Sequence, residues 1–218
     1  MTTPVSSSGF FISFEGGDGA GKSTQIELLA EALRQTGREV VITREPGGSP
    51  GGEAIRKLLL EGDANKWSPI SEALLMYAAR ADHLERTIEP ALKRGAVVIT
   101  DRFADSTMAY QGLAGDLGEK AVTTLYQLVV AARGPDLTII LDLPVEEGLK
   151  RSGATGDAEQ RFESKGAAYQ EKVRQAFLEI ARREPERCAV VSAKDGIADV
   201  AGRIREVIQT RFPQLLSR

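Results

Sequence analysis

Cysteine, histidine and tryptophan are nearly absent from this chain of 218 residues, which has one of each. One cysteine cannot form a disulfide within the chain, and one cysteine with one histidine argues against a structural zinc site. Long apolar runs are also missing, because no stretch approaches the 18 residues of a membrane-spanning helix. A net charge of −3 and a pI near 5.4 argue against a protein that coats nucleic acid. We therefore expect no nucleic-acid or membrane partner and a cytoplasmic location.

The remaining composition is that of a globular protein, with 42% hydrophobic and 27% charged residues. A chain of this length can bury a large core without disulfides. Residues 1–9 have neither the basic region nor the apolar stretch of a signal peptide. We expect them to be a flexible lead into a single domain over residues 10–218.

Short β-type apolar runs alternate with helical patterns along the chain. The expected strands are residues 10–14, 40–43, 96–100, 137–141 and 189–192. Strands that alternate with helices predict an α/β fold, with a five-stranded parallel sheet flanked by helices. The stretch from Ser152 to Glu159 interrupts the helical pattern and predicts a small mobile lid at about residues 151–164.

A glycine-rich segment between the first strand and the first helix matches the pattern G-x-x-x-x-G-K-[ST], which is typical of the P-loop NTPase fold. Glycines allow backbone N–H groups to surround a phosphate chain, and the following helix points its positive end at it. Lys22 can reach the β- and γ-phosphates, and the Ser23 hydroxyl can ligate Mg²⁺. The predicted nucleotide-binding residues are Gly16, Gly17, Asp18, Gly19, Ala20, Gly21, Lys22, Ser23 and Thr24.

A P-loop enzyme also needs a carboxylate at the end of a neighbouring strand to hold Mg²⁺ directly or through water. Asp101 and Asp142 both follow apolar strands. Asp101 is followed at once by Arg102. A carboxylate that can hold the metal, beside a cationic side chain that can bind a phosphate, suits transfer from one phosphate to another. Asp142 leads only into Leu143 and Pro144, so we favour Asp101.

A nucleotide-dependent switch protein is the competing class. Such a protein would need D-x-x-G after a strand and N-K-x-D for guanine. Asn65-Lys66 lacks an aspartate at the fourth position, and Asp199 to Gly202 lies within a helical pattern. Residues 192–194 do resemble a guanine-contacting S-A-K turn, so this alternative is kept.

Further motifs cover nearly the whole chain from Phe10 onward. They are F-E-G at 14–16, T-R-E-P-G-G at 43–48, I-R at 55–56, Y-A-A-R at 77–80, D-R-F at 101–103, D-S-T at 105–107, A-Y-Q-G at 109–112, P-D-L-T at 135–138 and G-L-K-R at 148–151. With the P-loop, they make the chain similar to the thymidylate kinases, close to the bacterial form. The resemblance implies a nucleoside monophosphate kinase fold, transfer of the γ-phosphate of ATP to dTMP with Mg²⁺, and a homodimer. Another deoxynucleoside monophosphate kinase of the same fold remains the alternative.

The resemblance also implies the residues around the acceptor phosphate and the sugar. Arg102 would grip the acceptor phosphate, with Arg56 as a second clamp, and two cations there offset the repulsion between two anionic substrates. Asp18 would reach the sugar 3′-hydroxyl, and Tyr110 would crowd out a ribose. Glu45 and Pro46 would lie at the pocket mouth, with a peptide bond between them that we expect to be cis.

The thymine-binding residues implied by the resemblance come from two helices. Met76 and Arg80 share one helical face, and Thr107 and Gln111 share another. Arg80 and Gln111 would read the base edges. Met76 stands where the family usually has a stacking phenylalanine, and a thioether can still pack on a ring.

The predicted lid departs from the family pattern. Family members with glycine at the place of Gly19 usually supply the catalytic arginine from the lid, yet residues 152–157 contain none. Arg161 is the favoured candidate to stabilise charge on the transferred phosphoryl group, and Arg151 is the second. His83 follows Arg80 by about one turn, and we expect it to be solvated or to face a dimer partner.

Overall fold

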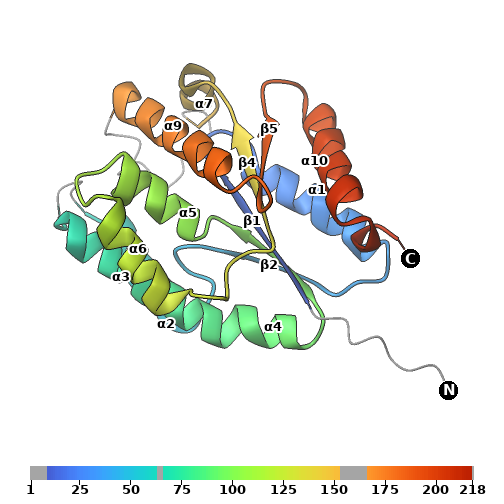
Figure 1. Cartoon of the computed structure of the whole chain (residues 1–218), viewed down its shortest axis with the longest axis horizontal. Coiled ribbons are helices and arrows are strands. Elements are labelled where there is room, and N and C mark those ends of the chain that lie inside the picture. Colours follow the sequence, from blue (N-terminus) through green and yellow to red (C-terminus); the bar gives the residue numbers. More distant parts are fainter. Residues whose placement is uncertain (1–8, 63–65, 153–165, 218) are drawn as a thin grey trace.

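The computed structural model describes residues 9–62, 66–152 and 166–217. Its sheet contains five parallel strands in the order β2-β3-β1-β4-β5, flanked by helices (Figure 1). The strands are β1 (Phe10–Gly16), β2 (Val40–Arg44), β3 (Val97–Asp101), β4 (Leu137–Asp142) and β5 (Cys188–Ser192). This confirms the predicted α/β class. Most of the predicted N-terminal lead and most of the predicted lid lie outside the described residues.

Helical segments connect successive strands and follow the last one. They are α1 (Lys22–Arg34), α2 (Pro50–Leu60), α3 (Pro69–His83), the π-helical turn η1 (Leu84–Ile88), α4 (Glu89–Lys93), α5 (Ala104–Thr107), the π-helical turn η2 (Met108–Leu113), α6 (Glu119–Val129), α7 (Val145–Ser152), α9 (Ala167–Arg183), α10 (Ile197–Arg211) and the 3₁₀ turn η3 (Pro213–Leu215). Among the described residues, no helix combines the length and apolar character needed to cross a membrane.

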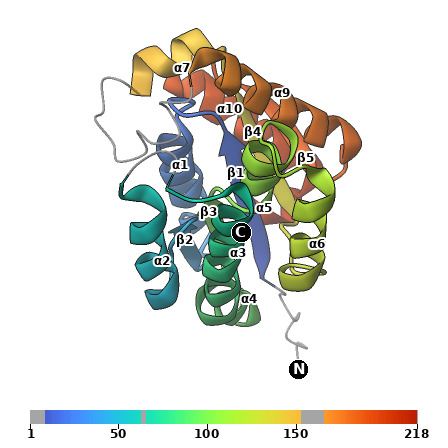
Figure 2. The same ribbon diagram turned by 90° about the vertical axis from the view of Figure 1, so that its left-hand side faces the viewer.

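The two faces of the sheet are covered by different helices. On one face, α1 and α10 pack Leu33, Ile204 and other apolar residues against the sheet. On the other, α3, α4, α6 and α9 surround a core that includes Phe11 and Phe177 (Figures 1 and 2). Burial on both faces explains why the central strands are continuous apolar runs rather than alternating ones.

Two helices begin at serine–proline pairs. The Ser49 hydroxyl accepts a hydrogen bond from the Gly52 N–H at 3.2 Å, and proline occupies the first turn of α2. Ser68 caps α3 in the same way, again followed by proline. The Ser49 cap thus starts α2 at Pro50. At the end of α3 the helical run changes to π-type geometry at Leu84.

The carboxyl ends of the strands gather the motifs at one edge of the sheet. The register pairs Phe14 with Asp101 across β1 and β3, and Arg44 with the same Asp101 across β2 and β3. The P-loop that follows β1 therefore lies next to Asp101 and to the chain leaving β2. Ligands of open α/β sheets bind at this edge.

Candidate active site

The P-loop packs tightly against the start of α7. Gly19 has φ +74°, and a Cβ atom placed there would lie 2.2 Å from the carbonyl oxygen of Gly148. The position is therefore closed to any side chain in this conformation. Ser23 and Thr24 are exposed in the first turn of α1, whose N-terminal N–H groups face the space enclosed by the loop.

One backbone carbonyl accepts hydrogen bonds from two cationic side chains. The Lys22 ammonium donates to the carbonyl oxygens of Gly16 at 3.3 Å and Gly17 at 3.1 Å. The Arg102 guanidinium donates to the same Gly16 oxygen at 3.1 Å. The structure thus brings the lysine of the P-loop and the arginine after β3 to one backbone oxygen.

The predicted metal-binding residues lie together. The Ser23 hydroxyl donates to Asp101 Oδ2 at 3.0 Å. Both side chains supply oxygen, the donor that Mg²⁺ prefers, so the pair fits this cation. The alternative carboxylate, Asp142, is engaged elsewhere, because the Arg174 guanidinium binds its two oxygens at 2.6 and 3.1 Å.

Arg102 has a strained backbone that its neighbours hold in place. Its φ of +67° is unusual for a residue other than glycine. The Arg102 N–H donates to the Phe14 carbonyl, and the Thr100 hydroxyl donates to the Arg102 carbonyl, both at 2.9 Å. Its guanidinium forms an ion pair with Asp18 and lies 5.3 Å from the centre of the Tyr110 ring. The strain aims the arginine at the P-loop.

Glu15 fixes the next residues of this turn from inside the protein. Its side chain is fully buried and accepts hydrogen bonds from the Phe103 N–H at 2.8 Å and from the Ser106 hydroxyl at 2.6 Å. Burial raises the pKa of Glu15 to about 8, with the negative charge of Asp105 acting in the same direction. Near neutral pH this carboxyl is therefore mainly protonated.

We expect Glu15→Gln to become relatively more stable as pH rises. The raised pKa means that the folded protein holds the proton more tightly than the unfolded chain, so this contribution to stability is present below about pH 4.5 and lost as pH rises through about 8. Glutamine mimics the protonated form at every pH. Urea unfolding should show the variant gaining about 1–3 kcal/mol on the wild type between about pH 5 and about pH 9. The same stability difference at both pH values would contradict a protonated Glu15.

A cavity with about 500 Å³ of empty space lies between the P-loop and α3. All the residues implied for dTMP binding except Arg56 line it, namely Asp18, Glu45, Pro46, Met76, Arg80, Arg102, Thr107, Tyr110 and Gln111. The Glu45–Pro46 peptide is cis, as expected. Arg56 reaches the rim, where its guanidinium donates to the Pro46 carbonyl at 2.8 Å.

Arg80 is the most enclosed charged side chain of the cavity wall, with 2% exposure. Its guanidinium lies between two aromatic rings, 4.6 Å from the centre of Tyr77 and 5.1 Å from that of Phe103. Nε donates to Glu45 at 2.8 Å and Nη2 donates to Thr107 at 3.0 Å. Nη1 is buried without a hydrogen-bond partner in the described part of the chain. The Arg80 Nη1 group therefore keeps two N–H donors unpaired within the described part of the chain.

Gln111 lies on η2, beyond the short helix that carries Thr107, rather than on one continuous α-helix with it. Both residues still line the cavity. The Gln111 amide nitrogen donates to Glu72 at 2.8 Å, which fixes the amide orientation and leaves its oxygen as an acceptor.

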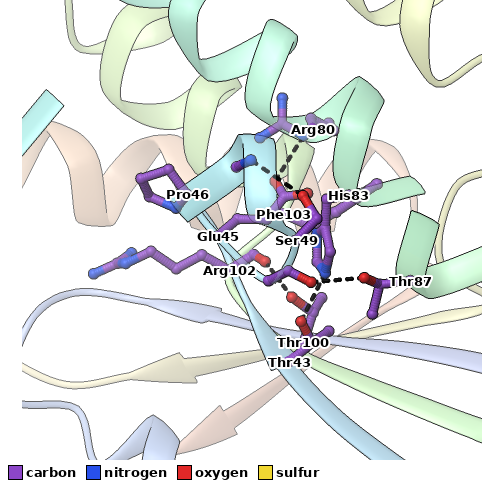
Figure 3. Close-up of polar contacts among 12 residues, drawn as sticks. Thr43, Glu45, Pro46, Ser49, Arg80, His83, Thr87, Thr100, Arg102 and Phe103 are labelled. Atoms are coloured by element: carbon purple, nitrogen blue, oxygen red, sulfur yellow. Dashed lines mark hydrogen bonds and ion pairs between the residues drawn. The ribbon is translucent and has the colours of Figure 1, made fainter. Parts of the chain in front are cut away.

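His83 differs from its prediction. We expected a solvated or partner-facing side chain, but the imidazole is fully buried within one chain. Its Nε2 lies 2.7 Å from the Thr43 hydroxyl and its Nδ1 lies 3.0 Å from Glu45 (Figure 3). Helical periodicity places a residue on a face of α3, but it does not say which segment covers that face.

Of the two candidate catalytic arginines, only Arg151 lies within the described residues, and its contacts are with the loop after β5. Arg151 donates to the carbonyls of Ala193 at 3.1 Å and Lys194 at 3.4 Å, in the loop after β5. Arg161 lies outside the described residues, so its role stays a prediction.

Sequence reasoning missed three residues that line the cavity, Leu60, Phe103 and Ser106, together with Glu15 beneath it. Phe103 and Ser106 follow the D-R pair, and Glu15 precedes the P-loop. Their nearness to named motifs was the available signal. The contact between residues 15 and 106 depends on the pairing of β1 with β3, which is not visible in a local pattern.

Comparison with known proteins gives one consistent result. The family model for thymidylate kinase matches residues 14–204. The chain is 57% identical to a thymidylate kinase of Caulobacter vibrioides over 204 residues, covering 94% of this chain and 98% of that protein. It is 51% identical to one of Ruegeria pomeroyi, covering 95% and 98%. The crystal structure of thymidylate kinase from Ehrlichia chaffeensis matches with a TM-score of 0.76 and 34% identity, over 92% of this chain and 99% of that chain.

Proposed function

This chain belongs to the thymidylate kinase family, and from that premise we infer that it transfers the γ-phosphate of ATP to dTMP, giving dTDP for dTTP synthesis. The observation that carries this function in the structure is the position of Arg102. Its guanidinium lines the cavity and also binds the Gly16 carbonyl of the P-loop. The acceptor phosphate and the transferred phosphate can therefore meet at one arginine.

The donor side of the reaction is assigned to the P-loop. Residues 16–24 would surround the phosphates of ATP, with Lys22 exchanging the Gly16 and Gly17 carbonyls for phosphate oxygens. Ser23 and Asp101 would hold Mg²⁺ directly or through water. When bound, Mg²⁺ would neutralise charge on the phosphates of ATP.

The acceptor needs no general base, because the second pKa of a phosphomonoester is about 6 and the nucleophile is already a dianion near neutral pH. Catalysis then consists of positioning and of charge neutralisation. Arg102 would bind the acceptor phosphate, and Arg56 would approach it from the cavity rim. Asp18, now paired with Arg102, would turn to the sugar 3′-hydroxyl.

The polar groups of the cavity favour thymine over cytosine. Thymine offers a carbonyl acceptor beside an N–H donor, which suits the Arg80 Nη1 donors and the Gln111 oxygen. Cytosine reverses this pattern, with an amino group beside a bare ring nitrogen. Met76 would pack on the base, while Tyr110 would lie near the sugar 2′ carbon and exclude a ribose.

We keep Arg161 as the proposed arginine that stabilises the transferred phosphoryl group. The contacts of Arg151 with the loop after β5 suit an adenine-side role better than a catalytic one. Arg161→Ala should therefore lower kcat more than Arg151→Ala does, and the reverse order would move the role to Arg151.

The direct test is ADP release from ATP and Mg²⁺ with dTMP, dUMP, dCMP, dGMP or AMP as acceptor. We expect dTMP to be preferred over dUMP by about 10- to 200-fold in kcat/KM, since one methyl group separates them. We expect dCMP to be disfavoured by about 10⁴-fold, because buried donors would be left unpaired. Equal turnover of all acceptors would indicate a less selective kinase. No acceptor-dependent turnover would make GTP binding the next measurement.

The proposed homodimer has a candidate surface on three neighbouring helices. Leu58 on α2, Ile70 and Leu74 on α3, and Leu128 on α6 are 46%, 43%, 50% and 78% exposed. Contacts join α2 to α3 and α3 to α6, and Figure 2 shows the three helices side by side. Exposed apolar side chains on adjacent elements are typical of a protein interface.

We expect Leu74→Glu to convert the protein from dimer to monomer, because it buries a charge at an apolar contact. Light scattering after size exclusion measures the mass. Ile197→Glu is the matched control, since Ile197 is 62% exposed on α10, away from this surface. A wild-type mass of one chain would refute the dimer.

The proposed location is the cytoplasm, because the reaction uses ATP as co-substrate.

A further inference from the structure

The histidine of this protein has no part in the phosphate transfer described above, yet both of its ring nitrogens are bonded. Nδ1 lies 3.0 Å from Glu45 Oε1, and Nε2 lies 2.7 Å from Thr43 Oγ1. The other Glu45 oxygen accepts from Arg80 Nε at 2.8 Å. Arg80 in turn donates to Thr107 at 3.0 Å. An unbroken hydrogen-bonded chain therefore runs from the end of β2 to the cavity (Figure 3).

The chemistry of the partners determines which group donates in each of these hydrogen bonds. An ionised carboxylate only accepts hydrogen bonds, so the histidine nitrogen that faces Glu45 must carry a proton. In the neutral imidazole the other nitrogen is then an acceptor, which the Thr43 hydroxyl satisfies. His83 therefore fixes one Glu45 oxygen and leaves the other for Arg80.

Close packing holds the His83 imidazole in this orientation. Gly48 has φ +75°, and a Cβ atom there would lie 2.4 Å from both His83 Nε2 and Thr43 Oγ1. The Thr87 hydroxyl donates to the Gly48 carbonyl at 2.7 Å and holds this glycine against the ring. His83 is fully buried and Glu45 is 5% exposed, so the contact between them is shielded from solvent.

We propose that His83 is a positioning residue for the acceptor nucleotide, acting through Glu45 on Arg80. This inference rests on the proposed function and assigns a role that phosphate chemistry does not require. Arg80 lines the cavity with Nη1 unpartnered in the described residues, so its orientation decides where a base carbonyl can bind. Loss of His83 frees the Glu45 carboxylate to rotate and loosens Arg80. The cost falls on binding of dTMP and not on binding of ATP.

Steady-state kinetics with a graded set of variants tests this division. His83→Phe keeps a ring without donors, and we expect KM for dTMP to rise about tenfold or more, with KM for ATP within about twofold. His83→Asn restores a donor near the Nδ1 position and should recover most of the loss. Thr43→Val should give a smaller rise in KM for dTMP. Ile204→Ala, a buried change in α10 on the other face of the sheet, controls for lost stability.

The presence of a single histidine allows a second measurement that does not depend on activity. Long-range ¹H–¹⁵N correlation of the imidazole reports which nitrogen carries the proton, with no ambiguity of assignment. We expect a proton on Nδ1, and a change in the imidazole signals when dTMP is added but not when ATP is added alone.

The outcomes separate the inference from the function. A wild type without dTMP-dependent turnover refutes the proposed function. An active wild type with an unchanged KM for dTMP in His83→Phe, or with Nδ1 unprotonated, overturns the role of His83 alone. Equal rises in KM for dTMP in His83→Phe and Ile204→Ala would also overturn it, because both would then reflect stability.

Discussion

Replacement of Arg102 by alanine is expected to lower kcat/KM for dTMP by about 10³-fold or more. The change removes the cation that lines the cavity and contacts the P-loop. It also removes the cation that forms an ion pair with Asp18, so less positive charge offsets the Asp18 carboxylate near the acceptor phosphate. A loss of 10³ corresponds to about 4 kcal/mol of transition-state stabilisation. Coupled ADP-release kinetics with varied dTMP measures it.

Two further variants separate catalysis from backbone strain. Arg102→Lys keeps the charge but not the planar donor fork, so its activity should lie between those of wild type and alanine. Arg102→Gly removes the same side chain as alanine but relieves the φ of +67°, so it should be about 1–2 kcal/mol more stable than Arg102→Ala. Both should be equally inactive. A loss below about tenfold in Arg102→Ala would place the acceptor phosphate elsewhere.

Replacement of Arg187 by methionine should have the largest effect on stability. Its guanidinium donates to both oxygens of Asp105, at 2.6 and 2.9 Å, and to Thr138 at 2.6 Å. The Asp105 side chain is only 10% exposed and raises the pKa of the nearby Glu15. Removal of the cation leaves a buried carboxylate uncompensated, which costs about 3–5 kcal/mol.

A double-mutant cycle in urea assigns this cost to the ion pair. Asp105→Leu combined with Arg187→Met removes both charges, and the double variant should recover most of the stability lost by Arg187→Met. If the double variant is as unstable as the sum of the single variants, the loss comes from packing of the arginine stem and not from the unpaired charge.

The parts of the site that could be predicted from the sequence are those formed by residues that are neighbours along the chain. The pattern of residues from Gly16 to Ser23 predicts a phosphate-binding loop, and the Asp101–Arg102 pair directly follows a predicted strand. Residues that meet only after the sheet forms could not be predicted in this way. Glu15 touches Ser106 because β1 pairs with β3, and His83 is covered by the chain leaving β2. The π-helical turn that contains Gln111 likewise could not be predicted from the spacing of apolar residues.

The shared carbonyl of Gly16 links the two halves of the site thermodynamically. Lys22 and Arg102 both donate to this oxygen, and the proposed function assigns Lys22 to ATP and Arg102 to dTMP. When a nucleotide draws one cation away from the Gly16 oxygen, the other cation alone remains bound to that oxygen. The free energy needed to detach the remaining cation then changes. If the proposed assignment holds, we expect binding of ATP and of dTMP to be coupled through this peptide group, and each would then alter the affinity of the other by the same factor.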